Sequence, residues 1–205
     1  MASSFKHISI EEYLRRLGSG DPTPGGGAAA ALTSAQGAAL IMMVANHTIG
    51  KPKYVEFEEL NNDILGEAEV LLKSLTDGID NDAEAFGKVS AAYALPKTDE
   101  EKRSAEISSA SVLAAEAPLM VMEDSLAALR LAATLKGRSN KMLESDVFVA
   151  ALHLYTGIRS AYYNVEANLP AIERADPALA TEMRQHTIDV LTAAADIIAE
   201  LSGKK

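Results

Sequence analysis

A long stretch without any formal charge, from Pro22 to Gly50, constrains the fold of this chain more than any other feature. Its length would suit a helix that crosses a membrane. It opens with Pro and Gly residues, however, and polar side chains such as Gln36 and Asn46 interrupt its apolar character. The residues before it, from Met1 to Ile10, lack the apolar core of a signal peptide. We therefore predict a helix that is buried among other helices, in a protein that makes no contact with a membrane.

The composition favours an all-α fold. Alanine supplies 36 residues, against 4 Phe and 6 Tyr, and alanine is both the best helix former and small enough to let helices pack closely. The length of 205 residues suits one domain. We expect residues 1–205 to form a single-domain bundle of about six helices, some of them kinked.

The charge and the missing cysteines narrow the class of protein. A formal net charge of −10 argues against nucleic acid or an anionic membrane as the partner, because both attract clustered Lys and Arg. The absence of Cys excludes disulfides and thiolate chemistry, and it is compatible with a reducing compartment. We therefore expect a cytoplasmic protein.

Start and stop signals divide the chain into its expected helices. The start signals are capping boxes at Ser9 with Glu12 and at Thr98 with Glu101, an N-cap at Ser145, and Asp176 followed by Pro177. We further expect a kink or a break at Asp77–Gly78, a bend at Pro118 and the end of a helix at Pro170.

The first candidate site is the run Pro24, Gly25, Gly26 and Gly27, which leads directly into Ala28. Glycines at a helix start leave backbone N–H groups open, and the positive end of the helix dipole favours an anion or an electron-rich ligand atom. The alternative is a flexible loop that only permits close packing. No P-loop or dinucleotide-binding motif is present.

The second candidate site is the pair Asp82 and Phe86. On a helix these residues are i and i+4, so a carboxylate and an aromatic ring share one face. The arrangement could place a base beside a flat ring. It could also be a solvated acidic turn followed by one core phenylalanine.

The third candidate site is a stripe of small and polar residues on the segment from Ser145 to Leu169. Asp146 and Asn164 are five helical turns apart and lie on one line of the helix. The stripe contains Asp146, Ala150, His153, Gly157, Ala161, Asn164 and Asn168. It could pack against another helix or face solvent. We expect no metal site, because no Glu-x-x-His pair occurs at either His153 or His186.

Taken together, several segments resemble the formiminotransferase-cyclodeaminase C-terminal family, which includes stand-alone methenyltetrahydrofolate cyclohydrolases. The matching segments occur in family order and cover about residues 22–170. They are Pro22–Leu32, Gly50–Tyr54, Asp82–Phe86, Ala91–Lys97, Ser145–Asp146 with Val149–Ala151, and Asn164–Leu169.

The resemblance implies a helical bundle that forms homodimers or higher homo-oligomers and binds a folate in a cleft. It assigns the catalytic acidic position to Asp82 and substrate binding to the glycine motif with Ser145, Asp146 and Asn164. In this setting Phe86 could pack on the pterin ring. Lys51, Lys53 or the amides of the glycine loop could bind the glutamate tail of the folate.

The implied reaction is the hydrolysis of 5,10-methenyltetrahydrofolate to 10-formyltetrahydrofolate, with Asp82 as the general acid and base and with no cofactor beyond the folate. Two alternatives stay open. One is a formimidoyltetrahydrofolate cyclodeaminase, which closes the methenyl ring and releases ammonia. The other is a protein that keeps the fold as a folate-binding or helical interaction protein without catalysis.

Overall fold

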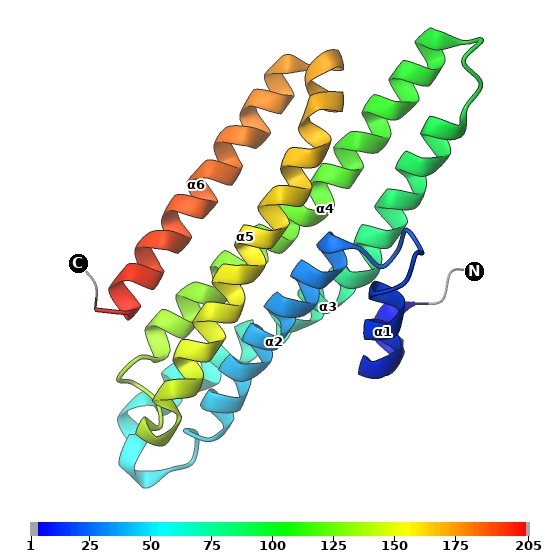
Figure 1. Cartoon of the computed structure of the whole chain (residues 1–205). Coiled ribbons are helices and arrows are strands. Elements are labelled where there is room, and N and C mark those ends of the chain that lie inside the picture. Colours follow the sequence, from blue (N-terminus) through cyan, green and yellow to red (C-terminus); the bar gives the residue numbers. More distant parts are fainter. Residues whose placement is uncertain (1–3, 204–205) are drawn as a thin grey trace.

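Six α-helices make up the computed structural model, which describes residues 4–203 (Figure 1). They are α1 (Ile10–Leu17), α2 (Gly26–Asn46), α3 (Glu58–Ala94), α4 (Glu100–Leu135), α5 (Glu144–Ala175) and α6 (Pro177–Leu201). Short 3₁₀ helices precede α1, α3 and α5, namely η1 (Phe5–His7), η2 (Pro52–Phe57) and η3 (Lys141–Leu143). The part of the chain that the structure describes contains no strand. The predicted all-α bundle of about six helices is confirmed.

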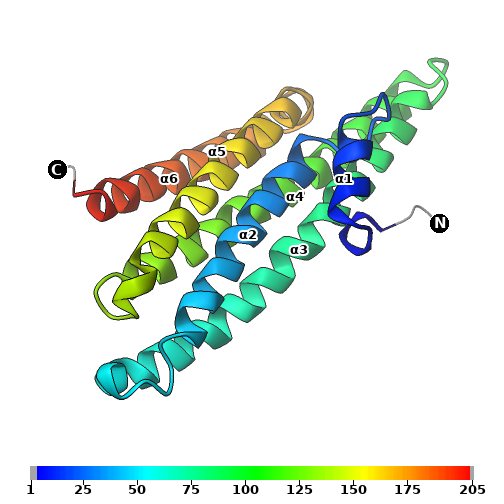
Figure 2. The ribbon, with the colours of Figure 1, turned by 60° about the horizontal axis from the view of Figure 1, so that its bottom comes forward.

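The charge-free segment forms α2, which packs against α3, α4 and α5 (Figure 2). By length and composition this helix could cross a membrane, but more than half of its most apolar part is buried inside the bundle. Small residues such as Ala28, Ala31 and Ala38 are fully buried along it. A charged side chain at these positions would be buried without a partner, at a high cost in stability. Burial among other helices therefore explains the missing charges, as predicted.

Two glycines bring α2 and α5 into close contact. A Cβ at Gly37 would lie 2.6 Å from Cγ of Leu154, and a Cβ at Gly157 would overlap Oγ of Ser34. Ser34 is itself buried and accepts a hydrogen bond of 2.7 Å from Ser125 on α4. The middle of the predicted small-residue stripe of α5 thus packs on α2, so the solvent-facing alternative is wrong.

We expect Gly157→Ala to lower the free energy of unfolding by about 1–3 kcal/mol, because the added methyl group overfills the contact with Ser34. The better helix propensity of alanine works in the opposite direction, by about 1 kcal/mol. Gly66→Ala is the matched control, since Gly66 is also helical but has open space around it. Urea denaturation measures both variants. A Gly157→Ala variant as stable as Gly66→Ala would contradict this account of the contact.

The helix boundaries agree with the predictions at two of the four starts. Ser9 caps α1 by accepting a bond from the Glu12 N–H, and Asp176 caps α6 by accepting one from Leu179. The other two predictions are wrong. Asp99, rather than Thr98, caps α4, and α5 begins at Glu144 after η3, so that Ser145 lies exposed in its first turn.

The predicted break at Asp77–Gly78 does not occur, and α3 continues through both residues. Asp77 forms ion pairs with Lys6 and Lys73 on the helix surface. Gly78 is buried, and a Cβ there would lie 3.2 Å from Val121 of α4. The glycine therefore serves close helix packing and does not end the helix.

The two interior prolines lie within continuous helices, so Pro170 does not end α5 as predicted. Proline lacks an N–H and leaves the carbonyl four residues earlier without its helical partner. At Pro118 of α4 that carbonyl belongs to Ala114, and the side-chain amide of Asn168 on α5 donates to it at 3.3 Å. A bond between two helices thus satisfies the carbonyl that Pro118 leaves free.

The N-terminal segment is fastened to the outside of α3. Ser4 and the backbone N–H of Phe5 both donate to the carboxylate of Asp80, and Lys6 pairs with Asp77. These contacts hold α1 across α3, as Figure 2 shows. The buried Tyr13 of α1 lies close enough to Asp82 of α3 to be affected by its charge.

Candidate active site

Asp82 on α3 lies directly against the first turn of α2. Its Oδ2 accepts a 3.0 Å hydrogen bond from the backbone N–H of Ala28. The first N–H groups of a helix have no partner within the helix, so a carboxylate here gains both a hydrogen bond and a favourable dipole. Gly27 makes this contact possible, because a Cβ at that position would overlap Oδ1 of Asp82. The glycine motif and the acidic motif therefore contact each other directly, and the contact depends on both.

Burial controls the ionisation of Asp82. It raises the pKa of this carboxyl above its ordinary value of 3.8, and the hydrogen bond from Ala28 works in the opposite direction. Phe86, one turn further along α3, is 43% exposed. The alternative of a solvated acidic turn with a core phenylalanine is therefore wrong on both counts.

Tyr13 is a neighbour of Asp82 that the sequence did not indicate. Its side chain is buried, and burial raises the pKa of the phenol to about 12, with the negative charge of Asp82 acting in the same direction. Its hydroxyl has no hydrogen-bond partner among the described residues. The phenol is therefore neutral at physiological pH. No sequence motif indicates that Tyr13 is a neighbour of Asp82, because Tyr13 occupies an ordinary apolar position of a short helix.

A cavity of about 370 Å³ opens beside Asp82. It is lined by Pro22, Thr23, Gly25, Gly26, Asp82, Ala85, Phe86, Val89, Ala114, Asn164, Ala167 and Asn168. Asp82 and Phe86 form one wall on α3, and Asn164 forms the facing wall on α5. Asn164 lies close to the glycine loop, since a Cβ on Gly26 would be 3.2 Å from its Oδ1. Within residues 4–203 no group of three His, Asp or Glu side chains is placed to hold a metal ion.

Most of the predicted binding residues meet at this cavity. Gly25, Gly26, Phe86 and Asn164 line it directly. Pro24 and Gly27 are buried just behind it, where Gly27 makes room for Asp82. Asn168 also lines the cavity, although the sequence indicates it only as a member of the stripe. Pro118 is the signal for its contact with α4, because Pro118 leaves the carbonyl of Ala114 free to accept a bond from the Asn168 amide.

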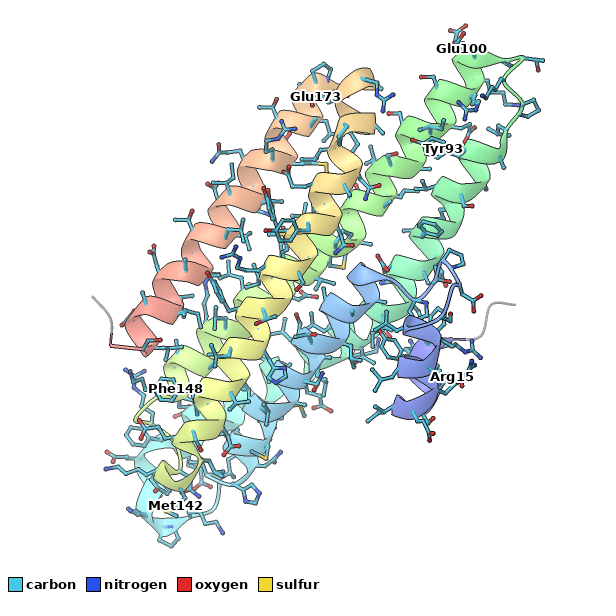
Figure 3. All side chains as sticks on the ribbon, viewed as in Figure 1. Arg15, Tyr93, Glu100, Met142, Phe148 and Glu173 are labelled. Carbon is cyan, nitrogen blue, oxygen red and sulfur yellow. The ribbon has the colours of Figure 1, made fainter. Side chains whose placement is uncertain are left out.

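Three predicted binding residues lie at the opposite end of the bundle, and one copy of the chain does not bring them to the cavity. Lys51 follows the C-terminal end of α2, which at 21 residues is about 30 Å long. Ser145 and Asp146 start α5 at the same end, near Met142 and Phe148 in Figure 3. Lys51, Ser145 and Asp146 of one chain therefore do not share a cleft with Asp82 of the same chain.

The comparison with known families agrees with this geometry. The model of the formiminotransferase-cyclodeaminase family matches residues 9–188. The chain belongs to this family. The match includes α1 with Tyr13, the glycine loop, Asp82 and both Asn164 and Asn168, so it covers every wall of the cavity.

The similar members of the formiminotransferase-cyclodeaminase family include both a cyclohydrolase and cyclodeaminases. The chain is 45% identical to a methenyltetrahydrofolate cyclohydrolase from Methylorubrum extorquens, over 85% of this chain and 84% of that protein. It is 31% identical to the formimidoyltransferase-cyclodeaminase of Sus scrofa, over 92% of this chain but only 35% of that longer protein. The crystal structure of a formiminotetrahydrofolate cyclodeaminase from Thermotoga maritima superposes with a TM-score of 0.89 at 27% identity, covering 97% of this chain and 96% of that one.

Proposed function

We propose that this protein is a methenyltetrahydrofolate cyclohydrolase, which converts 5,10-methenyltetrahydrofolate to 10-formyltetrahydrofolate reversibly and needs no cofactor beyond the folate. The observation that carries the proposal is the half-buried carboxylate of Asp82, seated on the first turn of α2 and open to a cavity with an exposed phenylalanine. The relative from Methylorubrum extorquens, which shares this length, supports the choice of reaction.

The proposed mechanism uses Asp82 twice. The methenyl group is part of a delocalised amidinium cation, which a nearby carboxylate stabilises. Asp82 accepts a proton as water adds to the methenyl carbon, and a tetrahedral intermediate forms. The same proton then passes to N5 as the carbon–N5 bond breaks. The hydroxyl proton of the intermediate is released to solvent as the carbonyl forms, which leaves the formyl group on N10. Burial raises the pKa of Asp82, so its protonated form is a more accessible intermediate than it would be for an exposed aspartate.

The alternative within the family is a formimidoyltetrahydrofolate cyclodeaminase, because ring closure and ring opening act on the same carbon. The cyclodeaminase from Thermotoga maritima also matches over nearly its whole length, so the match in length is compatible with either reaction. The higher identity to the cyclohydrolase favours hydrolysis. A non-catalytic folate-binding or helical interaction protein is the remaining alternative.

One assay separates these three functions. Purified protein is given methenyltetrahydrofolate and, separately, formimidoyltetrahydrofolate, while the methenyl absorbance and the release of ammonia are followed. We expect loss of the methenyl absorbance with the first substrate and no ammonia with the second. Ammonia release with gain of absorbance would assign the cyclodeaminase reaction, and thermal stabilisation by folate without any turnover would assign a binding protein.

We also propose a cytoplasmic homo-oligomer. Lys51, Ser145 and Asp146 belong to the ordered family motifs but lie about 30 Å from Asp82, and a second copy packed in the opposite direction would bring them to the cavity. A strictly monomeric particle that turns over at full rate, measured by light scattering and by activity against protein concentration, would contradict this arrangement.

A further inference from the structure

The cavity at Asp82 does not end at Phe86, because α2 is much shorter than the helices around it. It begins at Gly26, half-way along the bundle, whereas α3, α4 and α5 continue past that level (Figure 1). A second cavity of about 220 Å³ lies further along the same three helices. It is lined by Tyr93, Glu100, Arg103, Ser104, Ile107, Ala171, Arg174 and Ala175.

The two cavities occupy consecutive turns of the same helix faces. On α3, Phe86 and Val89 line the first cavity, and Tyr93 lies one turn beyond Val89 in the second. On α5, Asn168 lines the first cavity and Ala171 lines the second, three residues later. Residues at spacings of three and four share one side of a helix. The two cavities are thus parts of one groove with α4 as its floor.

The far end of the groove carries an excess of positive charge. Arg103 of α4 stacks over the ring of Tyr93 at 5.7 Å and donates to the Tyr93 carbonyl, while its Nε is buried and has no partner among the described residues. Arg174 of α5 lies on the facing wall, and its Nε donates to the carbonyl of Pro170. Glu100 is the one carboxylate that lines this cavity. No ion pair within residues 4–203 joins it to either arginine at 4.0 Å or less.

The length of the groove matches a ligand with a reacting ring at one end and an anion at the other. Asp82 and Tyr93 are eleven residues apart on α3, or about 16 Å at 1.5 Å per residue. A folate bound with its methenyl carbon at Asp82 has its benzoyl ring and then its glutamate carboxylates further along. Phe86 and Val89 offer an apolar surface for the benzoyl ring. The guanidinium groups are the side chains best suited to bind carboxylates.

We propose that Arg103 and Arg174 form the binding site for the glutamate tail of the folate, at the far end of the groove from Asp82. This inference rests on the proposed folate function and replaces Lys51 and Lys53 as the tail-binding cations. The second cavity thus makes the protein selective for folates that carry glutamate, and a γ-linked chain of glutamates can leave the groove where α3 ends and α4 begins. Figure 3 shows Tyr93, Glu100 and Glu173 gathered at that end of the bundle.

The test compares substrates that differ only in the tail. The probes are 5,10-methenyltetrahydrofolate with one glutamate, the same compound with three γ-linked glutamates, and 5,10-methenyltetrahydropteroate with none. For the double variant R103Q/R174Q we expect KM for both glutamate-bearing probes to rise by about 10- to 100-fold with little change in kcat, because bonds between charged groups are lost. KM for the pteroate probe should stay at the wild-type value.

Two further variants distinguish a tail site from a structural role. E100Q removes the competing carboxylate, so we expect it to lower KM for the glutamate-bearing probes, an effect that loss of structure would not produce. R130Q removes an exposed arginine of α4 outside the groove and should change no KM. Circular dichroism and melting temperature verify that each variant is folded.

The outcomes separate this inference from the proposed function. If wild-type protein hydrolyses methenyltetrahydrofolate and R103Q/R174Q keeps its preference for glutamate-bearing probes, the tail site is wrong and the function stands. If wild-type protein turns over none of the probes, the proposed function is wrong. Calorimetry then measures the affinity of the wild type for each probe and tests whether Arg103 and Arg174 bind the glutamate tail. Equal affinity for the glutamate-bearing and pteroate probes would overturn the tail site as well.

Discussion

Replacing Asp82 by Asn is expected to reduce kcat by about 10²- to 10⁴-fold, the usual effect of removing a general acid or base. Asn keeps the shape of the side chain and an oxygen that can accept the 3.0 Å bond from Ala28, so the cavity should be preserved. It can neither take up nor return a proton at the pH of the reaction. KM should change less than kcat, since the binding walls on α5 are untouched.

The pH dependence of Asp82 gives the same variant a second signature. As the base, Asp82 must be ionised, and its pKa is raised by burial, so we expect the rate of the wild type to fall with decreasing pH already above the usual range of an aspartate near 3.8. The acid limb should be absent from the residual rate of Asp82→Asn. A residual rate with an unshifted acid limb would assign that limb to another group.

We expect Asp82→Asn to lower activity without lowering the stability of the fold. Because the pKa of Asp82 is higher in the folded than in the unfolded state, its contribution to stability is fully present below 3.8 and is lost as the pH rises through the folded-state pKa. At neutral pH the ionised carboxylate therefore destabilises the fold. Asp82→Asn should unfold at the same or a higher urea concentration than the wild type.

The matched control for Asp82→Asn is Glu84→Gln, which neutralises an exposed carboxylate on the same helix outside the cavity. It should leave kcat unchanged. Full activity of a folded Asp82→Asn variant would remove Asp82 from the mechanism.

Replacing Gly27 by Ala is expected to reduce kcat by about 10²-fold, although Gly27 is buried behind the cavity and carries no chemistry. Its new Cβ would overlap Oδ1 of Asp82, so the carboxylate must rotate or α2 and α3 must separate. A misplacement of a reacting group by about 1 Å commonly costs such a factor. The same overlap should lower the free energy of unfolding by about 1–3 kcal/mol, against a gain of about 1 kcal/mol in helix propensity.

A double-mutant cycle tests whether Gly27 acts through Asp82. If it does, Gly27→Ala should lower kcat little further in a protein that already carries Asp82→Asn, because coupled effects do not add. Gly66→Ala, in open space on α3, should leave kcat unchanged in both backgrounds. Additive losses would mean that Gly27 acts on the substrate or on the fold, independently of the carboxylate.

Much of the fold was predictable from local patterns, and the centre of the site from the family resemblance. The charge-free stretch predicts the buried α2. The N-caps predicted at Ser9 and Asp176 depend only on neighbouring residues and are present in the structure. The pairing of the glycine loop with Asp82 followed from the family resemblance. The physical reason for it, a carboxylate that needs a helix start without side chains, became visible only when α2 and α3 were placed together.

Other features depend on contacts that local patterns do not encode. Pro170 should end a helix by its own chemistry, yet α5 continues to Ala175. The glycine at Gly78 predicts a break, whereas its neighbours on α2 and α4 need its small size. Lys51 was assigned to a shared cleft from its place in the motif order alone. The buried helix that the charge-free stretch predicts already separates Lys51 from Gly26, and α2 places the two residues at its opposite ends.

The point at which α2 begins gives the binding groove a length that is independent of its side chains. The groove exists where turns of helix are missing between α3 and α5, so residues added before Gly26 in helical form would fill it, starting at the cavity that Asp82 and Asn164 line. Each added helical turn would shorten the groove by about 5.4 Å. An insertion or deletion in the loop before Gly26 would therefore change the space left for a ligand, while the sequences of α3 and α5 stay the same.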